Sequence, residues 1–463
     1  MNASNESYHL TGSGFGANVA ARVSLSCVVV AGLFSFTIPA VADVATAILV
    51  LMAFSLLINN RVNYRRLPLI LAGIWMVFVV ASAIHATSLA LPGHHFKSLG
   101  KHLPIALGPL VAIPLSAACT RLRLRNDVIL VLFFSGLIVG ALFVLIRNDA
   151  IGLIVQGWSN TDHSFLGRIN RNFAALACGV CLITAASLLH YLLSEVGRSP
   201  NWTLAAAPLL ALIIVFVGKL LILMQSRTAY LATAVGLTVW LGSLIALAFL
   251  RPRAETKTIN WIFPIIIIAV VLAISAINLP IISQRFNGAA GLYFQILVDF
   301  MLGRPVQIAA IPSDGPDRLH MVAVAFDLIH QRPWLGWGPD ASRLLEIFSP
   351  FPGIRNLSQF HNGYMQVLVS FGVVGAALLL ALLLSLVWSA FDALAQVDPS
   401  VRLSPPLFAA VLSLILYLSI TNTTESITFV KPAAMICMLF AALACIQSRK
   451  LGEPSLTAST PES

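Results

Sequence analysis

Charge is scarce in this sequence. Only 10% of the 463 residues are Asp, Glu, Lys or Arg, whereas 58% are hydrophobic, and the mean hydropathy is +0.90. A soluble globular domain carries about 25% charged residues. The deficit excludes an ordinary soluble domain and indicates that lipid surrounds most of the chain.

Cysteine is also sparse, with six residues in the whole chain. All but Cys119 fall well inside apolar runs, including Cys178 and Cys181, which form a CxxC sequence. Within a transmembrane helix, free cysteines behave as small hydrophobic residues. Neither a disulfide framework nor a metal site is predicted. Residues 1–20 lack the basic and apolar regions of a cleavable signal peptide.

Several familiar catalytic motifs are missing. The sequence has no phosphate-cradling Gly-rich loop with a Lys, no Gly-x-Ser-x-Gly and no HExxH, and no glycosidase-type pair of acidic residues is evident. His94, His95 and His102 lie in a short loop with Lys97 and Lys101, where no carboxylate or Cys is near in sequence. A metal site is therefore not predicted there either.

What the sequence does contain is a series of apolar runs. Twelve of them, of roughly 17–25 residues, are long enough to cross a bilayer core of about 30 Å as helices. The predicted fold class is therefore an all-α polytopic membrane protein. The expected spans are 23–40, 43–59, 67–86, 103–119, 127–146, 172–193, 204–222, 228–250, 259–278, 363–388, 406–421 and 427–447.

Basic residues in the short loops predict the orientation of these spans. Clusters follow the second, fourth, eighth and twelfth spans, all on one side if the spans alternate, and such clusters mark the cytoplasmic side. Both termini then lie in the cytoplasm. The clusters are Arg61, Arg65 and Arg66; Arg121, Arg123 and Arg125; Arg251, Arg253 and Lys257; and Arg449 and Lys450.

The predicted organisation has five parts. Residues 1–22 form a cytoplasmic segment, 23–278 the first nine spans, 279–362 a large outer loop, 363–447 the last three spans and 448–463 a disordered cytoplasmic tail. The outer loop contains eight prolines and cannot be one helix. Within it, residues 318–331 have the pattern of an amphipathic helix.

A histidine motif ends the outer loop. It reads His361-Asn362, nine residues, Gly372, two residues, Gly375, and it lies where polar sequence meets an apolar run. An imidazole at the mouth of a membrane helix is a poor lipid anchor but a good acid or base. Gly372 and Gly375, one helical turn apart, are expected to let another helix approach closely.

The outer side also carries many arginines, whose planar guanidinium matches phosphate oxygens. Arg227 lies between two apolar runs with almost no loop, at a depth where charge is unfavourable unless it is paired or bound to a ligand. The alternative is an arginine whose side chain extends to the membrane interface. Arg168 and Arg171 bracket Asn170 before the sixth span, where interfacial anchoring is an equally good interpretation. Arg318 begins the amphipathic helix, where its charge opposes the helix dipole.

The remaining outer arginines have a simpler interpretation. Each is expected to be solvated or paired with one of the acidic residues of the outer loop. The arginines are Arg285, Arg304, Arg332, Arg343 and Arg355, and the acidic residues are Asp314, Asp317, Asp327, Asp340 and Glu346.

The histidine motif resembles that of the O-antigen ligases, a branch of a family that also contains O-antigen polymerases and protein O-oligosaccharyltransferases. The turn Gln225–Thr228 and the stretch from Arg318 through Pro333-Trp334-Leu335-Gly336-Trp337-Gly338 are similar to further family features. The resemblance covers roughly residues 160–380. It implies a C-type membrane glycosyltransferase (GT-C) architecture in the bacterial inner membrane, with an active site facing the periplasm and no metal or other cofactor.

The resemblance also implies the reaction. A polysaccharide would pass from undecaprenyl pyrophosphate to a sugar hydroxyl of lipid A–core, with inversion at the anomeric carbon. His361 would be the general base, Arg227, Arg318, Arg171 and Arg168 would bind the pyrophosphate, and Asn362, Gly372 and Gly375 would support the site. The implied partners are this donor, this acceptor and membrane lipid, and no nucleic acid.

Other functions remain open from the sequence. A polymerase would use a second lipid-linked glycan as acceptor, and a protein O-oligosaccharyltransferase would use the same donor. A transporter for an anionic lipid predicts charged residues in mid-helix near the bilayer centre. The nearest candidates, Asp43 and Lys431, lie close to span ends, which disfavours transport.

Overall fold

The computed structural model describes about two thirds of the chain. The described residues are 15–58, 66–91, 93–122, 124–156, 165–166, 169–195, 200–224, 226–250, 317–355, 357, 359–394 and 404–423, with single positions at 438, 441, 442 and 445. The predicted span 259–278 and most of 427–447 lie outside this set, as do the first part of the outer loop and the predicted tail 448–463.

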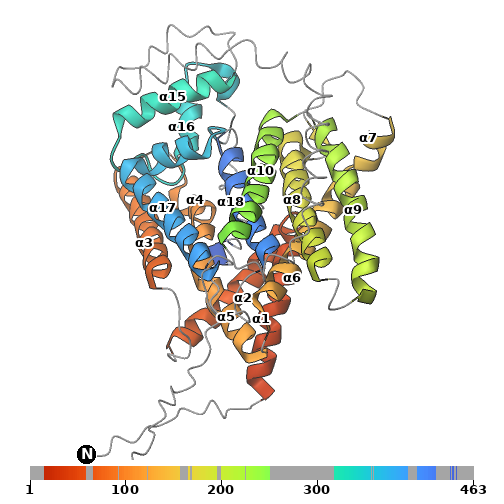
Figure 1. The fold of residues 1–463 in the computed structure, drawn as a ribbon. Coiled ribbons are helices and arrows are strands. Elements are labelled where there is room, and N and C mark those ends of the chain that lie inside the picture. Colours follow the sequence, from red (N-terminus) through yellow and green to blue (C-terminus); the bar gives the residue numbers. More distant parts are fainter. Residues whose placement is uncertain are drawn as a thin grey trace, which may run out of the picture.

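Long helices make up most of the described chain (Figure 1). Ten of the twelve predicted spans fall on described residues, and each coincides with a helix. These helices are α1 (Phe15–Phe34), α2 (Pro39–Ile58), α3 (Arg66–Ser88), α5 (Pro104–Leu122), α6 (Asn126–Arg147), α8 (Arg171–Glu195), α9 (Pro200–Leu223), α10 (Arg227–Leu250), α17 (Gly363–Leu394) and α18 (Pro405–Thr421).

Shorter elements connect the long helices. Between them lie α4 (His95–His102), α7 (Ala150–Gln156) and a two-residue antiparallel pair, β1 (Phe165–Leu166) and β2 (Ile169–Asn170). The described residues between α10 and α17, which the topology predicts to be on the outer side and which we call the outer part, contain α15 (Asp317–Gln331), the 3₁₀ turn η2 (Ala341–Arg343), α16 (Leu344–Phe348) and the 3₁₀ turn η3 (Pro352–Ile354). The amphipathic helix expected at 318–331 is confirmed as α15.

Within the described residues, seven helices are long and apolar enough to cross a membrane, or eight if α4 and α5, bent by 49°, form one broken span. The protein is therefore a helical membrane protein. The total of twelve spans and the GT-C architecture stay predictions.

Two expected boundaries were wrong. The first span was expected at 23–40, but α1 covers Phe15–Phe34 and ends in a turn over 35–37, because Pro39 opens the next helix. The histidines at 94, 95 and 102 were assigned to a loop, whereas His95 and His102 are the two ends of α4.

The membrane helices differ in how much they are enclosed. The apolar stretch of α8 is 94% buried inside the protein, whereas that of α9 is only 17% buried, so α8 forms the interior and α9 the periphery. Helices α8, α10 and α18 pack together. Glycines bring α1 and α6 close, because a side chain on Gly140 would overlap the backbone of Leu33.

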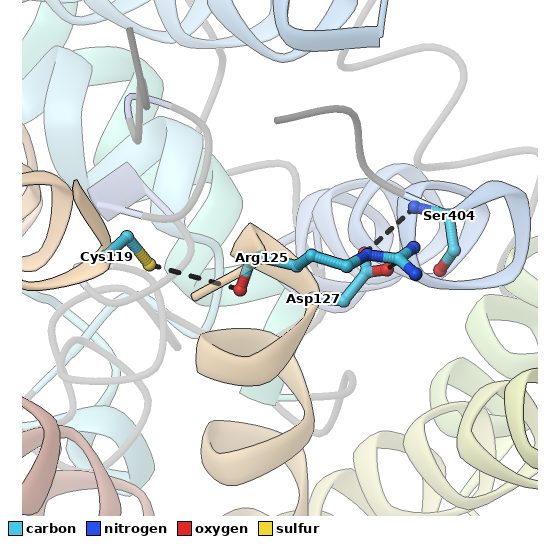
Figure 2. Close-up of polar contacts among 4 residues, drawn as sticks. All are labelled: Cys119, Arg125, Asp127 and Ser404. Atoms are coloured by element: carbon cyan, nitrogen blue, oxygen red, sulfur yellow. Dashed lines mark hydrogen bonds and ion pairs between the residues drawn. The ribbon is translucent and has the colours of Figure 1, made fainter. Parts of the chain in front are cut away.

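A buried carboxylate joins two helix starts on the predicted cytoplasmic side (Figure 2). Asp127, in the first turn of α6, accepts hydrogen bonds from the Arg125 side chain at 2.6 Å and from the backbone N–H of Ser404 at 2.9 Å. Ser404 directly precedes α18, so this contact joins residues 277 positions apart. The Asp127 side chain is only 1% exposed, and these donors help to compensate its buried charge.

The outer part has its own hydrophobic core. One face of α15 packs with Trp337, Phe351 and Phe360, and also with Val369 of α17. The beginning of α17 thus belongs to the outer core, whereas later residues such as Leu380 and Leu384 are exposed, as expected of a helix that faces lipid.

Candidate functional site

His361 lies immediately before α17, in the last turn of the outer part. Its backbone has a φ of +48°, a left-handed conformation that is uncommon for any residue other than glycine. The side chain is half-buried. A non-glycine residue held in this conformation is a reason to look for function at that position.

Asn362 is the N-cap of α17. Its side-chain Oδ1 accepts hydrogen bonds from the backbone N–H groups of Tyr364 and Met365, at 3.0 and 3.1 Å. These are the second and third residues of the helix, whose N–H groups have no partner within it. Asn362, which the sequence predicts to be a supporting residue, therefore has a physical role: it fixes where α17 begins and so the position of His361 just before the helix.

The end of α18 holds the same turn from the other side. The backbone N–H of Gly363 donates to the carbonyl of Asn422 at 2.8 Å, and the Tyr364 hydroxyl donates to the carbonyl of Ser419 at 2.9 Å. A side chain on Gly363 would overlap the amide of Asn422. The residue after Asn362 must therefore be glycine for α18 to approach this closely.

Gly372 breaks α17. It has φ +63° and ψ −166°, a backbone conformation open essentially only to glycine. A continuous helix would bond the N–H groups of residues 373 and 374 to the carbonyls of residues 369 and 370. At the break, these two N–H groups and two carbonyls form hydrogen bonds with residues outside α17.

The loop that follows α15 supplies those partners. The N–H groups of Val373 and Val374 donate to the carbonyls of Pro333 and Trp334, at 2.8 and 3.2 Å. In the opposite direction, the N–H groups of Trp337 and Gly338 donate to the carbonyls of Val369 and Ser370, at 2.9 and 2.8 Å. We call residues 333–338 and the break at Gly372, joined by these four hydrogen bonds, the clasp.

Glycines let the clasp close. Gly336 and Gly338 both have positive φ, +66° and +94°. A side chain on Gly336 would overlap the backbone of Ser370 and Phe371, and one on Gly372 would overlap the backbone of Trp334. The sequence motif had indicated a second helix against both motif glycines. For Gly372 this was wrong, because the loop backbone lies there instead.

Gly375 does face another helix. A side chain there would come within 2.8 Å of the Phe78 ring on α3. Phe78 and Phe371 form an aromatic cluster with Trp75 beneath the break, with ring centroids 5.3 to 6.2 Å apart. Gly375 therefore lets α3 and α17 approach, as the sequence predicts for this position.

Three of the four arginines predicted to bind the pyrophosphate lie among the described residues. Arg171 is the first residue of α8, half-buried, and follows Asn170, whose Oδ1 accepts the N–H of Asn172 at 2.8 Å as an N-cap. Arg227 is the first residue of α10. Arg318 is exposed in the first turn of α15, and Arg168 lies outside the described residues.

Two of the four arginines thus begin helices that pack with α18, the helix whose end holds the His361 turn. Their first N–H groups add partial positive charge to that of the guanidinium groups. Arg171, Arg227 and the His361 turn are therefore linked through one helix. Arg318 lies in the first turn of α15, which packs on α17 itself.

Other outer arginines have structural partners. Arg343 forms an ion pair with Glu346 at 2.7 Å, as expected. Arg332 lies over the Trp337 ring, 4.7 Å from its centroid, and the Nε of Arg355 donates to the carbonyl of Ser349 at 2.9 Å. These contacts stabilise the outer part.

The turn after the clasp is anchored to α4. The Asp340 carboxylate accepts the Ser98 hydroxyl at 2.6 Å and the backbone N–H of His94 at 2.7 Å. His102 bonds the carbonyl of Pro339 through Nε2 at 2.8 Å. Asp340 was one of five acidic residues named as possible partners of the outer arginines, and its described hydrogen bonds are with a hydroxyl and a backbone donor. The histidines of α4 therefore position the clasp.

Stability is expected to depend on the charge of Asp340. Burial alone would raise the pKa of this carboxyl, but the hydrogen bonds from Ser98 and His94, with the charges of Lys101 and His95, hold the pKa below its ordinary value of 3.8. A depressed pKa stabilises the fold above pH 3.8, and this contribution is lost as the pH falls through the folded-state value. Wild-type protein should exceed Asp340→Asn in unfolding free energy by about 1–3 kcal/mol at pH 7.

The measurement is thermal or denaturant unfolding in detergent from pH 7 to pH 3. The difference between wild type and Asp340→Asn should shrink as the solution becomes acidic. Glu346→Gln, which removes an exposed carboxylate, serves as the matched control and should show little effect. A wild-type advantage that stayed constant down to pH 3 would contradict the assignment.

Among the described residues, no group of three or more His, Cys, Asp or Glu side chains could hold a metal ion. Asp43 is exposed near the start of α2, and Lys431 lies outside the described residues. The described part of the candidate site is therefore built from a histidine, two asparagines, helix N-termini and arginines. Such groups can accept a proton and stabilise negative charge.

Sequence reasoning missed Asn422, the contact of Gly336 with α17 and the bond between Ser98 and Asp340. Each depends on residues far apart in the chain, so no local pattern marks it. The sequence Trp334-Leu335-Gly336-Trp337-Gly338 offered a hint, because two glycines in a short stretch indicate a tight turn or a close backbone approach.

The fold and the site define a helical membrane protein with a histidine-bearing turn where its outer part meets the membrane helices. Residues 209–380, a segment of 172 residues in a chain of 463, match the family model described as O-antigen ligase. No curated protein matches the chain.

Proposed function

We propose that the protein transfers a polysaccharide from undecaprenyl pyrophosphate to a sugar hydroxyl of lipid A–core, on the periplasmic face of the bacterial inner membrane. The single observation that carries this proposal is the family match, which contains Arg227, Arg318 and the whole histidine motif. Arg168 and Arg171 precede the matched segment; the role of Arg171 rests on its place at the start of α8, and that of Arg168 on its nearness to Arg171 in the sequence.

The chemistry follows from the location. Outside the membrane there is no ATP, so the donor must already carry a good leaving group, and pyrophosphate is one. The acceptor oxygen attacks the anomeric carbon, the bond from that carbon to the phosphate oxygen breaks, and the hydroxyl proton passes to His361. Displacement in one step inverts the anomeric carbon.

The arginines act on the leaving group. Negative charge grows on the pyrophosphate as the glycosidic bond breaks, and positive groups fixed in place stabilise that charge. Arg227 and Arg171 at helix N-termini are suited to this role, because the helix ends reinforce their charge. Arg168 and Arg318 are proposed to complete the anion site. The apolar spans would hold the polyprenyl and acyl chains.

A reconstitution assay tests the proposal. Purified protein in nanodiscs is supplied with undecaprenyl-pyrophosphate-linked oligosaccharide, with and without lipid A–core. A ligase should modify lipid A–core and leave the donor glycan at constant length when lipid A–core is omitted. Growth of the donor chain without lipid A–core would favour the polymerase, and labelling of an added protein acceptor the O-oligosaccharyltransferase. Loss of donor into the aqueous phase or the other leaflet, without transfer, would favour a transporter.

A further inference from the structure

The turn that carries His361 is attached to the end of α18. Asn422, the residue after α18, is only 6% exposed, and its backbone carbonyl accepts the N–H of Gly363. Its side-chain amide lies directly over Gly363, where no larger residue would fit. Both the backbone and the side chain of Asn422 thus contact the residue two positions after His361.

Neighbouring contacts point the same way. Tyr364 donates its hydroxyl to Ser419, one turn earlier on α18, and Asn362 holds the first N–H groups of α17. The N–H of Asn422 itself returns to the carbonyl of Leu418. The end of α18 and the start of α17 are therefore held in one geometry, and a left-handed residue such as His361 has little freedom to change its direction.

Helix α18 connects this turn to the arginines. It packs along α10, which begins with Arg227, and along α8, which begins with Arg171. The path from the proposed base to the proposed anion site therefore runs through Asn422. Catalysis by groups on separate helices requires their spacing to be held within a fraction of an ångström, and an error of about 1 Å can cost about 100-fold in rate.

We infer that Asn422 is a positioning residue of the transfer reaction, which holds the His361 turn against α18 and so in register with the anion site. This inference rests on the proposed function. The residues from Ser404 to Thr423, which include α18, contain no Asp, Glu, Lys, Arg or His. The uncharged amide of Asn422 therefore holds the turn without adding a charge to this segment. The titratable and charged residues of α15, which packs on α17, are Asp317, Arg318, His320, Asp327 and His330.

The test compares three variants of the full-length protein in nanodiscs. Asn422→Ala removes the amide, and Asn422→Asp keeps the shape and adds one negative charge. Thr423→Ala, at the exposed next residue, is the matched control. Asn422→Asp is expected to fold, because its carboxylate would lie at the N-terminus of α17, where an anion is favourable. Melting temperature and gel filtration report folding, and transfer to lipid A–core is measured from pH 5 to pH 9.

Asn422→Ala should lower kcat by about 10- to 100-fold, with KM for the lipid-linked donor within about twofold, because geometry rather than donor binding is lost. Asn422→Asp should move the acid limb of the pH–rate profile upward by about half a unit to one unit, because a nearby negative charge favours the protonated, inactive imidazole. An unchanged limb would show that position 422 does not act on the His361 imidazole, and a loss of melting temperature without the selective fall in kcat would show a merely structural role. Thr423→Ala should behave as wild type.

His361→Ala in the same series separates two kinds of failure. If His361→Ala is inactive while Asn422→Asp keeps the wild-type pH profile and Asn422→Ala keeps the wild-type kcat, the positioning role of Asn422 is overturned and the proposed function stands. If His361→Ala transfers glycan at the wild-type rate, the role of His361 as base is overturned, and the inference for Asn422 falls with it.

Discussion

Replacing His361 by alanine is expected to reduce glycan transfer to lipid A–core by at least about 100-fold, because general-base catalysis contributes about 10²- to 10⁴-fold. Donor binding should be nearly unchanged, because the pyrophosphate is assigned to arginines on other elements. The measurement is single-turnover transfer together with direct binding of the lipid-linked oligosaccharide. His330→Ala, which removes an exposed histidine from α15 in the same outer part, is the matched control.

The left-handed backbone of His361 sharpens this test. Its φ of +48° is unfavourable for histidine and free of strain for glycine. His361→Gly should therefore be at least as stable as wild type and should lose transfer as completely as His361→Ala. If His361→Gly is inactive but as stable as wild type, the loss of transfer is due to the missing imidazole and not to misfolding. If His361→Ala or His361→Gly kept near-normal transfer, as His330→Ala should, His361 would not be the general base.

Hydropathy predicted the described membrane helices because lipid leaves the chain few alternatives. A backbone in the membrane must satisfy its hydrogen bonds internally, so each apolar run long enough to span becomes a helix. Residues 171–195 and 227–250 illustrate this, since both were placed within a few residues. Amphipathic periodicity likewise placed α15, whose apolar face covers the outer core.

The same reasoning failed at Gly372. The run 363–388 is apolar on both sides of that glycine, so hydropathy predicts one helix without a break. The break depends on the carbonyls of Pro333 and Trp334, some forty residues earlier, which replace the missing helical bonds. A glycine in an apolar helix is also common at ordinary packing contacts, as Gly375 shows.

The sequence predicted which types of residue form the candidate site better than it predicted how those residues are held in place. A histidine and arginines on the outer side follow from the motif and from the predicted topology. The asparagine at 362 was recognised as supporting, but its role as an N-cap depends on where α17 begins, and helix ends are the least certain feature of a sequence. Asn422 was invisible because its contact with Gly363 exists only in the folded protein.

Gly372→Ala is expected to open the clasp and to reduce transfer by about 100-fold or more. Alanine is strongly disfavoured at φ +63° and ψ −166°, at about 1–3 kcal/mol, and its side chain would overlap the backbone of Trp334. A continuous helix relieves both problems, because the N–H groups of Val373 and Val374 can then bond the carbonyls one turn earlier. That change releases the loop at 333–338 and with it the anchorage of the outer part.

The direct measurement is hydrogen exchange at the N–H groups of Trp337 and Gly338, which donate to α17 only while the clasp is closed. Their protection should fall in Gly372→Ala and also in Gly336→Ala, which crowds the clasp from the opposite side. Gly73→Ala on the neighbouring helix α3 is the matched control, since a side chain there meets nothing within 4 Å. It should keep both protection and activity.

The two halves of α17 explain why activity should follow the clasp. The nine residues before Gly372 follow His361 and Asn362 and include Val369 of the outer core and Phe371 of the core between the membrane helices, whereas the 22 residues from Val373 to Leu394 extend over about 33 Å, enough to cross a bilayer. Once the clasp opens, the loop 333–338 no longer fixes the direction of the first half, which then rests on its packing against α15 and α3 and on the contact with α18. Unchanged protection of Trp337 in Gly372→Ala would show that the position of the loop does not depend on this glycine. Full transfer by a variant whose clasp is open would show that catalysis does not depend on the clasp.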